Sequence, residues 1–266
     1  MRDMARRYID LWLSFFRNSL TREMEYKANF ISGIVVDALY YIVHLFFFEI
    51  IYRNVSSLGE FSREDVIIFL IITFIADAVY MFFFSGNLFS INHLLVTGDL
   101  DFYLLRPVNS QFIVSLRYVR PYAIITFVFL VVILVSQCVD YSGDISGYNV
   151  ILFIISFLSG MSIWYSLNFT IACGCFWFKN FRMAGWLSNE ILKFSRRPDS
   201  IYTGVVRFTL FSFIPMALIA SVPTRFLIYD YNIKYLSLQI SISIVLLYIT
   251  RVTWEKGLII YESASS

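Results

Sequence analysis

The chain has 266 residues, of which 59% are hydrophobic and 15% are charged. A soluble protein carries roughly 25% charged residues, and so large an apolar surplus does not fit inside one water-soluble core. The composition therefore indicates an integral membrane protein. Lys and Arg number 21 against 19 Asp and Glu, so the net charge of +2 gives no reason to expect a nucleic-acid partner.

Five long apolar segments are expected to cross the bilayer as helices, because about 20 apolar residues span its hydrocarbon core. They are residues 28–52, 66–88, 119–139, 148–178 and 233–252. Two further segments compete for a sixth crossing: 181–194, which contains charged residues, and 208–222, which is short and broken by Pro215. The prediction is an all-α fold of six transmembrane helices in a single domain, residues 1–266.

Basic residues gather on one side of these expected spans, and basic loops resist translocation across a membrane. The basic residues on that side are Arg2, Arg6, Arg7, Arg17, Arg22, Lys27, Arg106, Arg117, Arg120, Arg251 and Lys256. The opposite loops, 53–65 and 140–147, hold only Arg53 and Arg63. Both termini are therefore predicted to be cytoplasmic. The first span is too long for a cleavable signal peptide and is expected to remain as an anchor.

Residues 4–24 repeat large apolar side chains at intervals of three to four residues, with charged residues mainly between them. Met4, Tyr8, Trp12 and Leu20 lie on the apolar side of this pattern. This spacing predicts an amphipathic helix that lies in the cytoplasmic membrane interface. The alternative is a cytoplasmic extension of the first span.

Sequence motifs for enzyme chemistry are missing. A P-loop needs a Gly-Lys dipeptide to cradle phosphates, and the chain contains none. It also lacks the serine-nucleophile, zinc-protease and dinucleotide motifs, and its three cysteines show no paired metal spacing. No catalytic, cofactor-binding or metal-binding residue is expected, and the chain is not expected to be an enzyme.

Asp37 and Asp77 are charged residues in the middle of predicted spans, where each costs about 2.5–3.5 kcal/mol on insertion scales. Counting 1.5 Å per residue places both near the middle of the bilayer. One interpretation is a polar seam that belongs to a translocation path or a helix interface. The other is local hydrogen bonding to Tyr40, Tyr41, Thr73 or Tyr80. Neither span offers a Lys or Arg partner.

The loop at 90–119 is long for a connection between neighbouring spans and is expected to have a function. Within it, residues 98–108 read GDLDFYLLRPV and resemble the motif G-x-L-D-x-x-L-L-R-P-V. Residues 25–30, EYKANF, resemble E-Y-R-A-N-F, and 198–202 with 213–215 and Pro223 resemble Y-P-L-S-I-Y…I-P…P. In the last match Arg197 and Asp199 depart from the pattern. Together these stretches resemble the permease subunits of ABC-2-type exporters, in particular the small six-span "ABC-2 family transporter protein" group.

The resemblance implies a permease that works with a separate cytoplasmic P-loop ATPase dimer, which would hold the ATP and magnesium. The loop would carry a coupling helix within residues 90–106 that docks on the ATPase. Leu94, Leu95, Phe102, Leu104 and Leu105 would form its apolar ridge, with charge from Asp99, Asp101 and Arg106. The alternative for this loop is a surface connection without a partner.

The resemblance also implies that 181–194 is the fifth span and 208–222 an outward re-entrant segment, whereas hydropathy alone favours 208–222 as the span. Two permease subunits, identical or related, would form the path in a bacterial inner membrane, in contact with its lipid. A path rich in aromatic residues favours a lipophilic or cationic small molecule. The rival hypothesis is a self-contained secondary transporter in which Asp37 and Asp77 bind protons or cations.

Overall fold

The computed structural model describes residues 2–55, 57–88, 90–178, 181 and 183–261. In this part of the chain all regular secondary structure is helical. The long helices are α1 (Arg2–Glu25), α2 (Lys27–Tyr52), α3 (Arg63–Phe83), α8 (Tyr122–Val139), α9 (Gly147–Cys173) and α13 (Ile233–Ile260). Shorter helices are α4 (Ser85–Leu88), α5 (Ile91–Thr97), α6 (Leu100–Leu104), α7 (Ser110–Leu116), α10 (Ala184–Leu192), α11 (Gly204–Phe211) and α12 (Ser221–Ile228). Three 3-10 turns complete the order, η1 (Gly174–Phe176), η2 (Asp199–Ile201) and η3 (Met216–Leu218).

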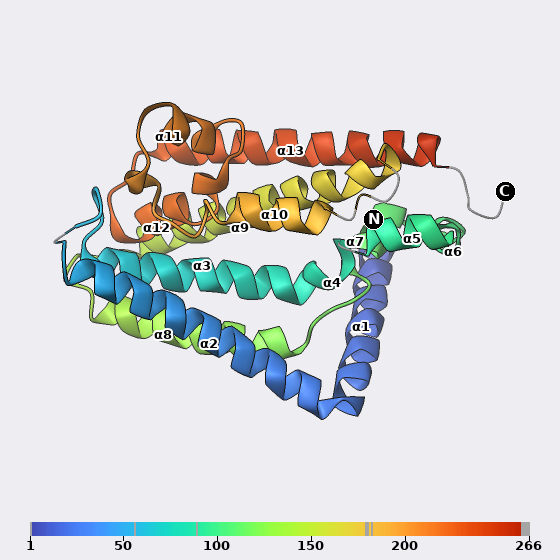
Figure 1. Ribbon diagram of the computed structural model, residues 1–266, viewed down its shortest axis with the longest axis horizontal. Coiled ribbons are helices and arrows are strands. Elements are labelled where there is room, and N and C mark those ends of the chain that lie inside the picture. Colours follow the sequence, from blue (N-terminus) through green and yellow to red (C-terminus); the bar gives the residue numbers. More distant parts are fainter. Residues whose placement is uncertain (1, 56, 89, 179–180, 182, 262–266) are drawn as a thin grey trace.

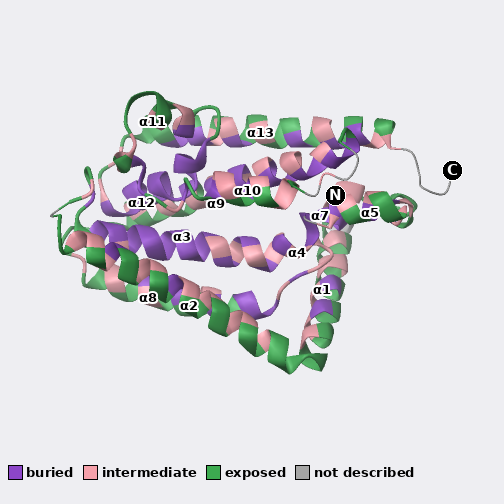
Figure 2. Cartoon of the chain, viewed as in Figure 1, coloured by how far each residue is buried: buried purple, intermediate pink, exposed green. Residues whose placement is uncertain are grey.

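Five helices lie side by side as a bundle, namely α2, α3, α8, α9 and α13 (Figure 1). Each is long and apolar enough to cross a membrane, counting η1 as the end of α9, which confirms the expectation of an integral membrane protein. α3 is the central helix, and it is buried on nearly all sides from Ile68 to Ala76, whereas α2 and α8 keep exposed apolar faces (Figure 2). Such faces are suited to contact with lipid.

The ends of these helices follow local sequence signals. Ser62 and Asp65 form a capping box at the start of α3, and Ser146 and Asn232 cap α9 and α13. α8 begins after Pro121, which shifts its start beyond the expected residue 119. α13 continues to Ile260, past the expected residue 252, and its Arg251 pairs with Glu255 one turn on.

α1 is a separate helix that runs steeply across one end of the bundle (Figure 1). It is divided from α2 at Tyr26, whose backbone leaves helical geometry at φ −114° and ψ 62°. Trp12 and Phe16 pack on Phe82 of α3, and Ser19 accepts a hydrogen bond from the backbone N–H of Val119. α1 is therefore packed along the end of the bundle and does not continue the line of α2, as the extension alternative required.

The chain between α9 and α12 has an unusual course. α9 ends beside α5, and η1 contacts both α5 and α13. By Ser200 the chain has reached the opposite end, where the Ser200 hydroxyl donates to the carbonyl of Leu58 at 2.8 Å. It thus passes along the whole bundle, and among its described residues only α10, nine residues long, is α-helical.

The segment from α11 to α12 leaves and returns at this same end. Asp199 at its start donates its N–H to Ser221 Oγ, and Tyr229 at its close donates to the carbonyl of Glu60. The two helical parts, Gly204–Phe211 and Met216–Ile228, meet at a bend of 61°. The expected segment 208–222 is therefore a bent excursion with both ends beside residues 58–65.

A buried polar clamp holds η3 inside the bundle. Gln239 of α13 is fully buried, and its side-chain amide donates to the carbonyls of Ser156 at 2.9 Å and Leu218 at 2.7 Å. Ser156 Oγ donates in return to Gln239 Oε1 at 2.7 Å. A Cβ at Gly160 would lie 2.9 Å from the carbonyl oxygens of Leu218 and Ile219, so a glycine is needed where η3 crosses α9. In an apolar bundle such bonds fix the position of irregular backbone.

Candidate functional site

A cavity of about 240 Å³ lies between α2, α3, α9 and α10, and both predicted aspartates are among the residues that line it. Asp37 comes from α2 and Asp77 from α3, and the opposite wall is formed by Asn168, Ser188 and Arg196. Ser188 of α10 donates a hydrogen bond to Asn168 of α9, which fixes the short α10 against the bundle. The cavity thus joins three long helices to α10 and the connection that follows it.

Asp77 has a basic partner that the sequence of the spans did not reveal. Arg196, in the connection from α10 to η2, places its Nη2 3.6 Å from Asp77 Oδ1. The Tyr41 hydroxyl donates to Asp77 Oδ2 at 3.4 Å, and the Arg196 guanidinium lies 5.2 Å from the Tyr40 ring centre. Neither span supplies this partner, and only the tertiary fold brings Arg196 to Asp77.

Asp37, unlike Asp77, has a carboxylate oxygen without a hydrogen-bond partner among the described residues. This atom, Oδ2, is buried. Of the four expected local partners, Tyr41 bonds to Asp77, and the Thr73 hydroxyl donates to the carbonyl of Phe69. The cavity therefore presents one partnered carboxylate and one without a partner, side by side.

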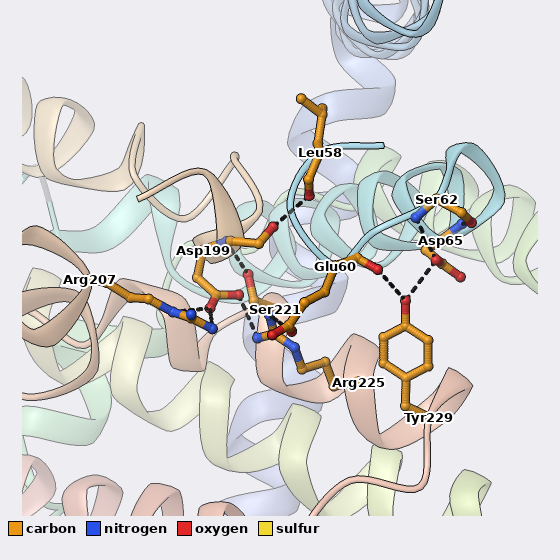
Figure 3. A network of polar contacts seen from close by, with 10 residues as sticks. Leu58, Glu60, Ser62, Asp65, Asp199, Arg207, Ser221, Arg225 and Tyr229 are labelled. Atoms are coloured by element: carbon orange, nitrogen blue, oxygen red, sulfur yellow. Dashed lines mark hydrogen bonds and ion pairs between the residues drawn. The ribbon is translucent and has the colours of Figure 1, made fainter. Parts of the chain in front are cut away.

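A second polar cluster lies at the end of the bundle where the 53–62 loop and α12 meet (Figure 3). Asp199 and Arg225 are each 1% exposed, and Arg225 Nη1 donates to Asp199 Oδ1 at 2.6 Å. Arg207 donates to the other Asp199 oxygen, and Arg225 Nη2 lies 3.2 Å from Glu60 Oε2. The carboxylates of Asp199 and Glu60 thus compensate the charges of Arg207 and Arg225.

Asp65 continues this cluster toward the start of α3. Its two carboxylate oxygens accept hydrogen bonds from the hydroxyls of Tyr141 and Tyr229, both at 2.7 Å. Burial, together with the neighbouring Asp65 carboxylate, raises the pKa of Tyr141 and of Tyr229. Both phenols therefore stay protonated, and they tie the 140–147 loop and the end of α12 to α3.

The expected coupling region forms α5 and α6, which lie beyond the end of α3 and beside α1 (Figure 1). Four apolar side chains here are exposed: Val96, Phe102, Leu104 and Leu105, called the α5–α6 patch below. Leu105 is 81% exposed and Phe102 is 66% exposed. A cluster of exposed large apolar residues outside the apolar part of the bundle is typical of a protein-binding surface.

Other residues of the expected ridge do not share this face. Leu94 is buried in the core, and Leu95 packs partly against it, so the expectation that Leu94 belongs to an exposed ridge was wrong. The reason is the helical turn of α5, which directs Ile91 and Leu94 inward and Val96 outward. Asp99 accepts a hydrogen bond from the Thr97 hydroxyl at 2.8 Å, Asp101 is half-buried, and Arg106 is exposed.

The α5–α6 region is fastened to α1 and α13 through the segment that follows it. Arg7 donates to the carbonyl of Pro107 at 3.2 Å, and the N–H of Asn109 donates to the Tyr8 hydroxyl at 3.1 Å. The Trp254 indole N–H of α13 donates to Ser110 Oγ at 3.1 Å. Displacement of this region would therefore pull on α1 and on the last long helix.

A model of the protein family described as "ABC-2 family transporter protein" matches residues 38–265. The chain belongs to this family. The match begins within α2 and includes the other four long helices of the bundle, the α5–α6 region and the bent excursion. No curated protein and no solved structure matches the chain.

Family membership makes this ABC-2 chain a multi-pass membrane permease, and it confirms the resemblance found in the sequence. Members of this family transport molecules across membranes, and in general they depend on a partner ATPase. The roles of individual residues in the ABC-2 chain rest on its own geometry, described above.

Proposed function

We propose that this ABC-2 chain is the permease subunit of an ATP-driven exporter that works with a separate cytoplasmic P-loop ATPase dimer. ATP and magnesium belong to the ATPase, and the permease itself is not an enzyme and holds no cofactor or metal. The sequence supports this division, because without a Gly-Lys dipeptide it has no phosphate cradle of the P-loop kind. The observation that carries the proposal is the α5–α6 patch in a chain of this family.

In this proposal the 90–106 loop is the coupling helix that docks on the ATPase. The patch would supply its apolar contact, while Asp99, Asp101 and Arg106 would supply charge complementarity to the docking groove. The attachments of Pro107, Asn109 and Ser110 to α1 and α13 support transmission of ATPase movement into the bundle. The burial of Leu94 gives it a supporting position beneath the patch.

The end that carries α1 and α5–α7 would face the cytoplasm of a bacterial cell, with both termini on that side of the inner membrane. α1 would lie in the membrane interface, which its steep inclination to the bundle supports (Figure 1). The basic residues of α1 and of the 106–120 segment support this orientation, because basic segments stay on the cytoplasmic side.

Six crossings would then result from the five long helices and the passage through α10. The bent excursion from α11 to α12 would be an outward re-entrant segment. Its two ends beside residues 58–65 support this interpretation, as does the pairing of Arg207 and Arg225 with carboxylates. Irregular backbone at membrane depth is tolerated where protein buries it.

The translocation path would form between two permease subunits, either two copies of this chain or this chain and a related one. An apolar groove of about 900 Å³ between α2, α3 and α8 supports a lipophilic substrate. The carboxylate of Asp37, which lacks a partner among the described residues, supports a cationic group on such a molecule.

A site-specific photocrosslinker tests this proposal. The purified complex would carry the crosslinker at Leu105 or, as the matched control, at Val205, which is equally exposed at the opposite end of the bundle. We expect a covalent product with a P-loop ATPase, identified by mass spectrometry, from position 105 alone. A product from position 205, or a functional transporter without any ATPase, would contradict the proposal.

The secondary-transporter alternative depends on Asp37 and Asp77 and gives a distinct result. We expect the purified chain in proteoliposomes to show no flux driven by an ion gradient alone. Asp77→Asn should lower the free energy of unfolding by about 1–2 kcal/mol, because it removes the carboxylate facing Arg196. Asp37→Asn, which breaks no ion pair, should change it less. Gradient-driven flux that is lost in both variants would favour the alternative.

A further inference from the structure

A cavity of about 310 Å³ lies between α1 and the segments that flank α7, and three arginines line it. Arg22 comes from α1, Arg106 follows α6, and Arg117 follows α7. The remaining lining residues, Phe15, Asn18, Ser19 and Tyr118, carry no charge. No carboxylate lies within 4 Å of the three guanidinium groups in the described part of the chain.

The frame of this cavity is well fixed. The buried side chain of Asn87 accepts from the N–H of Tyr118 at 2.7 Å and donates to its carbonyl at 2.8 Å. The Tyr118 ring contacts two cations, with Arg22 at 5.1 Å and Arg117 at 5.4 Å from its centre. Arg117 also lies 4.7 Å from the ring centre of Tyr103, so two aromatic rings hold it in place.

The acidic side chain next to Arg22 in the sequence is engaged outside the cavity. Glu23, the neighbour of Arg22, accepts the N–H of Tyr122 at 3.3 Å and lines an adjoining cavity with Arg120. Burial raises the pKa of Glu23, whereas the Tyr122 N–H, Arg120 and Arg22 oppose that rise. Arg106 and Arg117 form no ion pair with a described carboxylate, so their charge is available to an outside anion.

We propose that this cavity, the Arg22–Arg106–Arg117 site, binds a phosphate-bearing anion at the membrane surface. Guanidinium groups match phosphate oxygens with paired hydrogen bonds, and basic pockets between helices bind lipid headgroups in this way. Ser19 adds a hydroxyl donor. Its oxygen accepts the N–H of Val119, which leaves its O–H proton to donate to the anion. A bound phosphate would join α1 to both ends of the α6–α7 segment.

Lipid and soluble phosphate are two sources of this group, and titration of the full-length purified chain in detergent separates them. The thermal unfolding midpoint would be followed with short-chain phosphatidylglycerol, with phosphatidylcholine and with inorganic phosphate. We expect phosphatidylglycerol to raise the midpoint well above the effect of phosphatidylcholine. The double variant Arg22→Gln/Arg106→Gln should bind it at least about tenfold more weakly, because two charged hydrogen-bond donors are lost.

The matched control is Arg17→Gln/Arg53→Gln, which removes the same charge from exposed arginines outside the cavity. It should bind phosphatidylglycerol as the unaltered chain does. Arg22→Lys/Arg106→Lys should restore only part of the affinity, because lysine keeps the charge without the paired geometry. A response to inorganic phosphate that the Gln variant loses would identify soluble phosphate as the source. Equal lipid affinity of the Gln variant and its control would overturn the site.

Discussion

A negative charge at Leu105 is expected to uncouple the permease from its ATPase while the helical bundle stays folded. Leu105 is 81% exposed, so Leu105→Asp removes almost no packing inside the chain. Docking through an apolar anchor is far more sensitive, because truncation of one such anchor costs about 2 kcal/mol or more of binding energy. ATP-dependent transport should therefore fall at least tenfold, and Phe102→Asp should act in the same direction.

Ile259→Asp is the matched control for this experiment. Ile259 is 84% exposed and lies near the end of α13, outside the α5–α6 patch. Transport, ATPase activity and the amount of ATPase bound to the purified permease would be measured for each variant. We expect Leu105→Asp to lose bound ATPase and the control to keep it. Normal transport by Leu105→Asp, with ATPase bound as before, would refute docking through this patch.

The apolar bundle could be predicted from sequence because each of its five long helices is a long, mainly apolar segment, and several begin at a capping residue or a proline. Lys27–Tyr52 differs by one residue from the expected span, and Gly147–Cys173 begins at a Ser146 cap. The fifth passage could not be assigned in this way. The only α-helix among its described residues, α10, is nine residues long. This passage is held by the contact of Ser188 with Asn168 and by the ion pair of Arg196 with Asp77. Neither contact produces a periodic pattern in the sequence that would predict it.

The residues of the candidate sites could likewise be predicted from sequence only in part. Hydropathy identified Asp37 and Asp77 individually, and helix rise placed them at one depth, yet the partner of Asp77 lies in a distant connection. The pairing of Asp199 with Arg225 was also hidden, because charge counting treats each arginine as if it stood alone. In the coupling region the motif located the loop, but only the folded α5 separates the buried Leu94 from the exposed Val96.

Breaking the Asp199–Arg225 pair is expected to destabilise the fold more than breaking any other ion pair among the described residues. Both side chains are 1% exposed, and their closest atoms are 2.6 Å apart. Asp199→Asn leaves Arg225 buried without its main counter-charge and removes the partner of Arg207. Loss of one member of a buried pair costs about 3–5 kcal/mol of unfolding free energy. The thermal unfolding midpoint should fall by about 10 °C.

Two comparisons separate the buried charge from a general effect of substitution. Glu49→Gln breaks the ion pair between Glu49 and Arg63, whose side chains are 36% and 60% exposed, respectively. This variant should lower the free energy of unfolding by at most about 1 kcal/mol. Asp199→Asn/Arg225→Gln removes both buried charges and should be less destabilised than the sum of the two single variants. Additive losses would show that the two side chains act independently.

The position of the pair also predicts a functional consequence that stability alone does not explain. Arg225 of α12 is joined to Asp199 at the start of the bent excursion and to Glu60 of the 53–62 loop (Figure 3). This contact holds the excursion against the end of the bundle opposite the proposed coupling region. At a temperature where Asp199→Asn is still folded, its transport should therefore fall while ATPase binding through the α5–α6 patch remains. Loss of both together would instead indicate that the whole bundle had unfolded.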